Sequence, residues 1–163
     1  MRYPDGPRDA EAVAIDPISE TVLLLSKRDR PNRLYALPLA AFDEPATTHQ
    51  FNALGTVAVD ALPSPIALLR QPELLAIATY STGFDISADG ARATVLGYRR
   101  ARTVTRRADE SWTSALNRLQ PTNDHGLRQA EAIAFSRSGH ELTITSEGLH
   151  APLVTQTWPA ARP

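Results

Sequence analysis

A hairpin pattern in residues 129–148 constrains the fold of this chain more than any other feature of the sequence. Large side chains, Ile133 and Phe135, alternate there with alanines, and a strand places such neighbours on opposite faces. Since both faces are apolar, the pattern favours a strand that is packed on both sides. Residues 136–139 are typical of a turn, because Gly139 can adopt a positive φ. Apolar residues alternate again after the turn, so the segment predicts a β-hairpin.

Two earlier segments repeat this pattern. Residues 11–26 and residues 82–98 each contain an alternating strand, a turn and a second strand. The spacing from Ile86 to the equivalent Phe135 is close to one four-stranded propeller blade of roughly 40–50 residues. The spacing before Ile86 is longer and fits one blade plus an insertion within residues 43–81. Repeated hairpins at this period predict a β-propeller, with an ordinary β-sandwich or meander as the alternative.

The remaining segments complete an all-β prediction: a partial propeller of about three blades, built from antiparallel hairpins in a single domain over residues 1–158, with a tail at 159–163. One short amphipathic helix is predicted near 109–119, where Trp112 and Leu116 share one face. The apolar runs in residues 61–80 are predicted to form two strands, because Pro72 would break a helix that passed through both.

Several stretches resemble a known family. They are residues 3–12 with the strand that follows, residues 81–90, residues 129–135 and residues 145–148. The chain is similar in these stretches to an uncharacterised family of secreted bacterial six-bladed β-propellers, related in shape to the TolB-type and NHL-type propellers. The resemblance covers the C-terminal part of that family, so it implies further blades before the matching segment and an extracytoplasmic location. No signal peptide is expected in this chain, because no apolar segment follows residues 1–4.

Composition excludes several classes of function. The formal net charge is −1, and the arginines of residues 99–107 are interpreted as a solvated strand edge, so no nucleic-acid partner is expected. There is no cysteine, which excludes disulfides and thiolate chemistry. There is also no apolar run of about 18 residues, so no membrane span is expected.

Acidic and polar residues near the inner strands are the candidates for a site. The first strand of each blade lines the channel of a propeller, so polar groups at its end open near the channel mouth. Glu11 and Glu131 occupy equivalent positions in their repeats, and Lys27, Arg28 and Tyr98 are possible partners for such acids. The candidate ligand-binding or mouth residues are Asp9, Glu11, Thr82, Asp85, Glu131 and Glu147.

Three interpretations of these residues remain open. The first is that the chain is a binding or scaffold module, without a cofactor, for a small molecule or a protein. The second is a calcium-dependent hydrolase of the lactonase or phytase-like propeller type, with Ca²⁺ held by Glu11, Asp85 and Glu131. The third is a non-functional remnant of a longer propeller. Independently of function, such groups are expected to accept hydrogen bonds from backbone amides of the neighbouring blade.

An open arc of blades leaves apolar faces exposed to water, and such faces promote association. One expectation is therefore a homodimer in which two arcs complete one propeller. The alternatives are a truncated product or a self-associating fragment.

Overall fold

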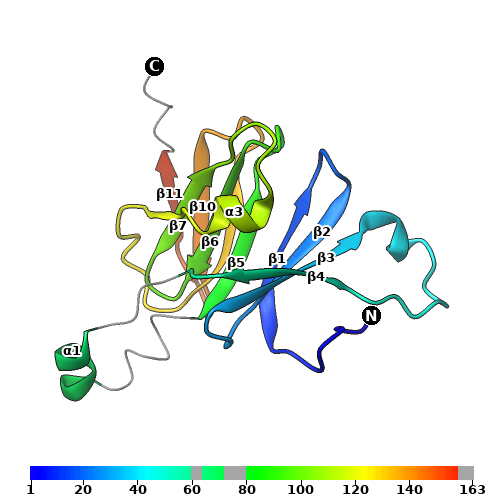
Figure 1. Ribbon diagram of the computed structural model, residues 1–163. Coiled ribbons are helices and arrows are strands. Elements are labelled where there is room, and N and C mark those ends of the chain that lie inside the picture. The colour runs from blue at the N-terminus through cyan, green and yellow to red at the C-terminus, as the bar shows by residue number, and fades with distance from the viewer. Residues whose placement is uncertain (60–63, 72–79, 158–163) are drawn as a thin grey trace.

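Three antiparallel sheets, arranged side by side as blades, make up the chain in the computed structural model, which describes residues 1–59, 64–71 and 80–157 (Figure 1). Blade 1 consists of β1 (Ala10–Asp16), β2 (Thr21–Ser26), β3 (Asn32–Pro38) and β4 (Asn52–Val57). Blade 2 consists of β5 (Ser81–Ile86), β6 (Arg92–Gly97), β7 (Ala101–Thr105) and β8 (Gln120–Pro121). Blade 3 consists of β9 (Ala130–Phe135), β10 (Glu141–Ser146) and β11 (Leu153–Thr157). The predicted all-β architecture of about three blades is confirmed.

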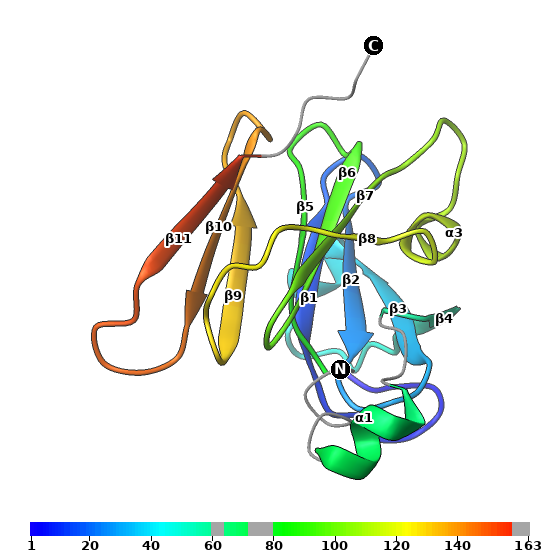
Figure 2. The same cartoon turned by 90° about the vertical axis from the view of Figure 1, so that its left-hand side faces the viewer.

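The first strands of the three blades are neighbours in space. β1 packs beside β5, and β5 packs beside β9, as the view in Figure 2 also shows. Each of these inner strands pairs with the next strand of its own blade in antiparallel register. The three hairpins of the sequence repeat are therefore the inner halves of the three blades.

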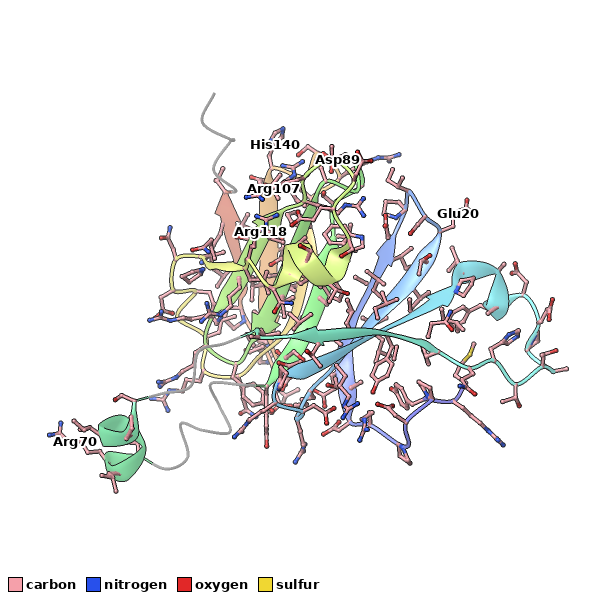
Figure 3. The ribbon with its side chains drawn as sticks, in the orientation of Figure 1. Glu20, Arg70, Asp89, Arg107, Arg118 and His140 are labelled. Atoms are coloured by element: carbon pink, nitrogen blue, oxygen red, sulfur yellow. The ribbon has the colours of Figure 1, made fainter. Side chains whose placement is uncertain are left out.

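The turns of the inner hairpins lie at one end of the molecule. Figure 3 labels one residue in each turn, Glu20, Asp89 and His140. In blades 2 and 3 the turn closes through the N–H of Gly90 or Gly139, which has a φ of 65° or 70°. Glycine suits these positions because it adopts positive φ without strain.

The main core lies between blades 1 and 2. Alternate residues of β1, Ala12 and Ala14, pack there against Phe84 and Ile86 of β5, together with residues of the outer strands and of the helix α3. A smaller core between blades 2 and 3 contains Ile133 and residues of β6 and β10. Each blade thus contributes one apolar face to an interface with its neighbour, which is how layered β-structures bury such faces.

A segment of the chain covers part of the other face of blade 1. We call residues 1–8 and 39–51 the cap; the latter range includes the 3₁₀ helix η1 (Leu39–Phe42). Tyr3 and Phe51 of the cap stack at 5.4 Å between ring centroids, and Tyr3 packs on Tyr35 of β3 at 5.0 Å. The cap therefore buries the outer strands of this face, whereas Val13 and Ile15 of β1 remain about half exposed.

The predicted helix near 109–119 is confirmed in a shorter form, α3 (Trp112–Leu116). Ser111 is its N-cap, and the Ser111 hydroxyl accepts a hydrogen bond from the Ser114 N–H. Asn117 donates to the Thr56 carbonyl at 3.0 Å, and Thr113 donates to the Leu54 carbonyl at 3.2 Å. The helix thus covers the free edge of β4, which would otherwise expose unpaired backbone groups.

One expectation about residues 61–80 was wrong. Residues 66–69 are not a strand, because α1 (Pro65–Arg70) is a helix. Proline is favoured at the first position of a helix, and Pro72 follows this helix instead of interrupting it. The predicted second strand at 74–78, like the predicted tail at 159–163, lies outside the described residues.

Candidate functional site

The candidate site lies at the end of the inner strands opposite the turns, which is the lower end in Figure 1. Glu11 is near the start of β1 and Glu131 near the start of β9, while Asp9 and Glu147 lie just outside strands of blades 1 and 3. We call this end the polar mouth, defined by Asp9, Glu11, Lys27, Arg28, Tyr80, Tyr98, Glu131 and Glu147.

Lys27 is the central residue of the polar mouth. It follows β2, and its side chain is only 6% exposed. Its Nζ lies 2.5 Å from Glu11 Oε2, and the ammonium lies 5.7 Å and 5.4 Å from the ring centroids of Tyr80 and Tyr98. Burial alone would lower the pKa of Lys27, but hydrogen bonds with Glu11 and Tyr98 raise it above its ordinary value. Lys27 is therefore a fixed positive charge in an aromatic and acidic surrounding.

The two tyrosines and Arg28 form the wall beside Lys27. The rings of Tyr80 and Tyr98 meet edge to face at 5.9 Å, an arrangement that aromatic pairs favour. Arg28 lies over the Tyr80 ring at 5.2 Å and forms an ion pair with Asp9. These contacts confirm the predicted pairing of Lys27 and Arg28 with acidic residues.

Glu131 and Glu147 lie close to each other in the polar mouth. Burial raises the pKa of Glu131, and the nearby charges of Glu11 and Glu147 raise it further, whereas Lys27 acts in the other direction. Within the described residues, no salt bridge joins Glu131 or Glu147 to a cation. The polar mouth therefore holds more carboxylates than cations close to one another.

Two predicted site residues lie elsewhere. The buried Thr82 hydroxyl donates to the Ala130 carbonyl of blade 3 at 2.7 Å. Asp85 lies near the end of β5 that leads into the turn, where its Oδ2 accepts from the Phe135 N–H of blade 3 at 2.7 Å. Burial raises the pKa of Asp85, although this N–H acts against the shift. Both side chains join neighbouring blades, as the hydrogen-bonding interpretation of these groups expects.

The three residues considered as calcium ligands do not lie at the same end of the inner strands. Glu11 and Glu131 share the polar mouth, whereas Asp85 is at the other end of its strand. Across residues 1–59, 64–71 and 80–157, no three His, Cys, Asp or Glu side chains are placed to hold one metal ion. Calcium binding by this trio therefore remains a prediction.

Sequence reasoning missed the buried Asp16. Its Oδ2 accepts from the Trp112 indole N–H at 2.8 Å and from the Ser19 hydroxyl at 2.9 Å, and Arg106 lies 3.4 Å away. Burial alone would raise the pKa of Asp16, but these donors hold it below its usual range. Arg106 also lies over the Trp112 ring at 4.2 Å. No local pattern indicates this cluster, because its members are far apart in the sequence.

An apolar hollow of about 790 Å³ lies at the turn end of the inner strands. Its lining includes Val13 and Ile15 of β1 and Leu39 and Phe42 of the cap. Ile86, Phe135 and the carboxyl-bearing Asp85 line it as well. The two ends of the inner strands therefore differ in chemistry: one is charged and aromatic, and the other is apolar.

Comparisons with known proteins support the fold. No family model matches the chain, and no curated protein matches its sequence. Among solved structures, the luciferin-regenerating enzyme matches with a TM-score of 0.54 and 14% identity over 94% of this chain and 46% of that chain. TolB from Acinetobacter baumannii matches with a TM-score of 0.52 and 12% identity over 96% of this chain and 32% of that chain.

Hydrazine synthase from Kuenenia stuttgartiensis matches with a TM-score of 0.52 and 11% identity over 91% of this chain and 34% of that chain. These neighbours are propeller-type proteins, so the class of fold is a β-propeller-like scaffold. The chain spans less than half the length of each of the three. No described helix has the length and apolar character needed to cross a membrane.

Proposed function

We propose that the chain is a β-propeller binding module and that the polar mouth holds its ligand. One observation carries the proposal: carboxylates from blades 1 and 3 and tyrosines from blade 2 gather around a single lysine. Loops and strand ends that a rigid scaffold positions in this way are common places for binding sites.

The expected ligand carries a positive charge, such as an organic ammonium group. Lys27 neutralises Glu11, whereas Glu131 and Glu147 repel each other and raise the pKa of Glu131. A cation beside these two glutamates would relieve that repulsion. Tyrosine rings also make favourable contacts with ammonium groups. The polar mouth is therefore expected to bind an organic ammonium group more favourably than a cation that offers only its charge.

The test measures thermal stability during titration with tetramethylammonium, putrescine or CaCl₂. A ligand that binds the folded state raises the melting temperature by mass action. We expect millimolar organic cation to raise the melting temperature of the wild type, and Glu131→Gln and Glu147→Gln to lose most of that rise.

Glu141→Gln is the matched control, since this exposed glutamate begins β10 at the turn end, away from the polar mouth. Equal shifts in all four proteins would indicate a non-specific salt effect and contradict the proposal. A shift with CaCl₂ alone would favour the calcium-dependent interpretation instead.

A further inference from the structure

The inner strands of neighbouring blades meet through a repeated fit of large side chains onto small ones. At the first interface, Ala12 and Ala14 of β1 receive Phe84 and Ile86 of β5 in one buried cluster. At the second interface, Gly83 of β5 receives Ile133 of β9: a Cβ at Gly83 would lie 3.1 Å from Ile133 Cγ2. Close packing of this kind leaves no room for a large residue at the small positions.

The two open ends of the arc carry the same two kinds of surface, with large side chains on blade 1 and small side chains on blade 3. On β1, the large pair is Val13 and Ile15, and these side chains are 50% and 48% exposed because none of the three described blades covers them. On β9, the small pair is Ala132 and Ala134, and both are exposed. The hairpin repeat places Val13 and Ile15 at the positions of Phe84 and Ile86. It likewise places Ala132 and Ala134 at the positions of Ala12 and Ala14.

The apolar hollow provides the space for an added strand. The cap covers the outer strands of this face and leaves the hollow open along β1, between Val13 or Ile15 and Phe42. On the opposite face of the arc, Thr143 and Thr145 of β10 pair with Ala134 and Ala132, so the part of this face next to β9 carries only small side chains. The large exposed side chain on the same side, Leu153, belongs to the outer strand β11. The face with large residues and the face with small residues are therefore complementary.

We propose that the occupant of this open face is a second copy of the chain, whose β9 places Ala132 and Ala134 against Val13 and Ile15. The contact continues the interface that already joins blades 1, 2 and 3. The contact is head to tail, because it joins blade 3 of one copy to blade 1 of the other. Two such contacts, related by a two-fold axis, close a ring that contains the three sheets of each copy. Electrostatic repulsion between the two copies is weak, because the net charge of each copy is only −1.

The experiment determines the solution mass of the full chain by size-exclusion chromatography with light scattering. We expect twice the chain mass of 17.7 kDa. Ile15→Lys and Ala134→Glu should each raise the dissociation constant of the dimer at least about a hundredfold, because a buried unpaired charge is costly. Leu54→Lys is the matched control, since Leu54 is 43% exposed beside α3, on the side of blade 1 that faces blade 2, and its substitution should leave the dimer intact.

Mixing the Ile15→Lys and Ala134→Glu variants provides a stricter test of the head-to-tail geometry. The mixture should form a heterodimer with one contact like that of the wild type, while the other contact pairs the introduced lysine of the first variant with the introduced glutamate of the second. Circular dichroism of each variant confirms that it is folded. A monomeric wild type, a dimer that persists in Ala134→Glu, or variants that stay apart when mixed would each overturn the proposal.

Discussion

The interface between blades 1 and 2 contains a buried network of side chains that the interface between blades 2 and 3 lacks within the described residues. At the first, the Asp16 carboxylate accepts from the side chains of Trp112, Arg106 and Ser19, in addition to side-chain bonds to the backbone such as that from Ser81 to the Ser26 carbonyl. At the second, Thr82 and Asp85 form hydrogen bonds with backbone groups of β9, and Arg92 donates to the Gly139 carbonyl at 2.6 Å.

The difference shows two ways of fixing one blade on the next. A network of side chains depends on the identity of every member, so the first interface requires Asp16, Trp112 and Arg106 together. A bond to the backbone requires one particular residue, because every residue of the partner strand except proline carries both an N–H and a C=O. The first interface should therefore be the more sensitive to single substitutions.

The largest effect is expected for Asp16→Ala. The change leaves the buried Trp112 N–H and Arg106 without their shared acceptor, which should lower the free energy of unfolding by about 3 kcal/mol at neutral pH. Because the pKa of Asp16 is lowered in the folded state, its contribution is present above about pH 4 and is lost as the pH falls through the folded pKa.

Urea denaturation at several pH values measures this prediction for Asp16. The exposed Asp43 offers a matched control, Asp43→Ala, which should change little. A loss no greater than that of the control would show that the side-chain network does not hold the first interface.

A smaller effect is expected for Asp85→Ala at the second interface. The Phe135 N–H loses its acceptor, so unfolding should become easier by about 1–2 kcal/mol. Asp85→Asn retains an acceptor oxygen and should lose less. Burial raises the pKa of Asp85, so the wild type should lose stability relative to Asp85→Asn as the pH rises from about 4 through the folded pKa. Thermal melting from acid to neutral pH checks both statements, and equal losses in the two variants would contradict them.

Thr82→Val tests the other bond at this interface. Valine keeps the shape of threonine but cannot donate to the Ala130 carbonyl, so a loss of about 1 kcal/mol is expected in urea denaturation. Thr82→Ser keeps the hydroxyl group and serves as the comparison. If serine proved as damaging as valine, packing would outweigh the hydrogen bond.

The smallest effect, with the opposite sign, is expected for Glu131→Gln in the polar mouth. The pKa of Glu131 is raised in the folded state, so ionisation of this carboxyl group destabilises the fold. The free energy of unfolding of the wild type should therefore fall as the pH rises from about 4 through the folded pKa. Glutamine removes this loss and should raise the melting temperature slightly at neutral pH. Glu141→Gln, whose residue begins β10 at the other end, should not change it. A lower melting temperature in Glu131→Gln would mean that the carboxylate is needed for folding.

Much of the fold followed from local patterns. The three inner hairpins and the helix at Trp112 were predicted because the spacing of apolar residues and the turn residues act over short distances. Helix α1 was not, because Pro72 excludes a helix through both apolar runs but does not exclude a short helix that ends before it. The cap was missed as well, because stacking of Tyr3 on Phe51 leaves no periodic signal.

The candidate site was predicted in part. Glu11, Glu131 and Glu147 come together because equivalent ends of inner strands lie side by side. Thr82 could not be separated from them in advance, because the bulge between Ser81 and Gly83 changes the face that a side chain occupies. Asp85 could have been separated, since it lies just before the turn that follows its strand.

The sequence by itself determined the alternation of large and small residues on β1, β5 and β9, because neighbouring side chains in a strand must point to opposite faces. Only the tertiary structure decided that Asp16 meets Trp112 and that Lys27 lies beside the rings of both Tyr80 and Tyr98. These residues belong to different blades, and the packing of one blade on the next, which no local pattern encodes, sets the distances between them.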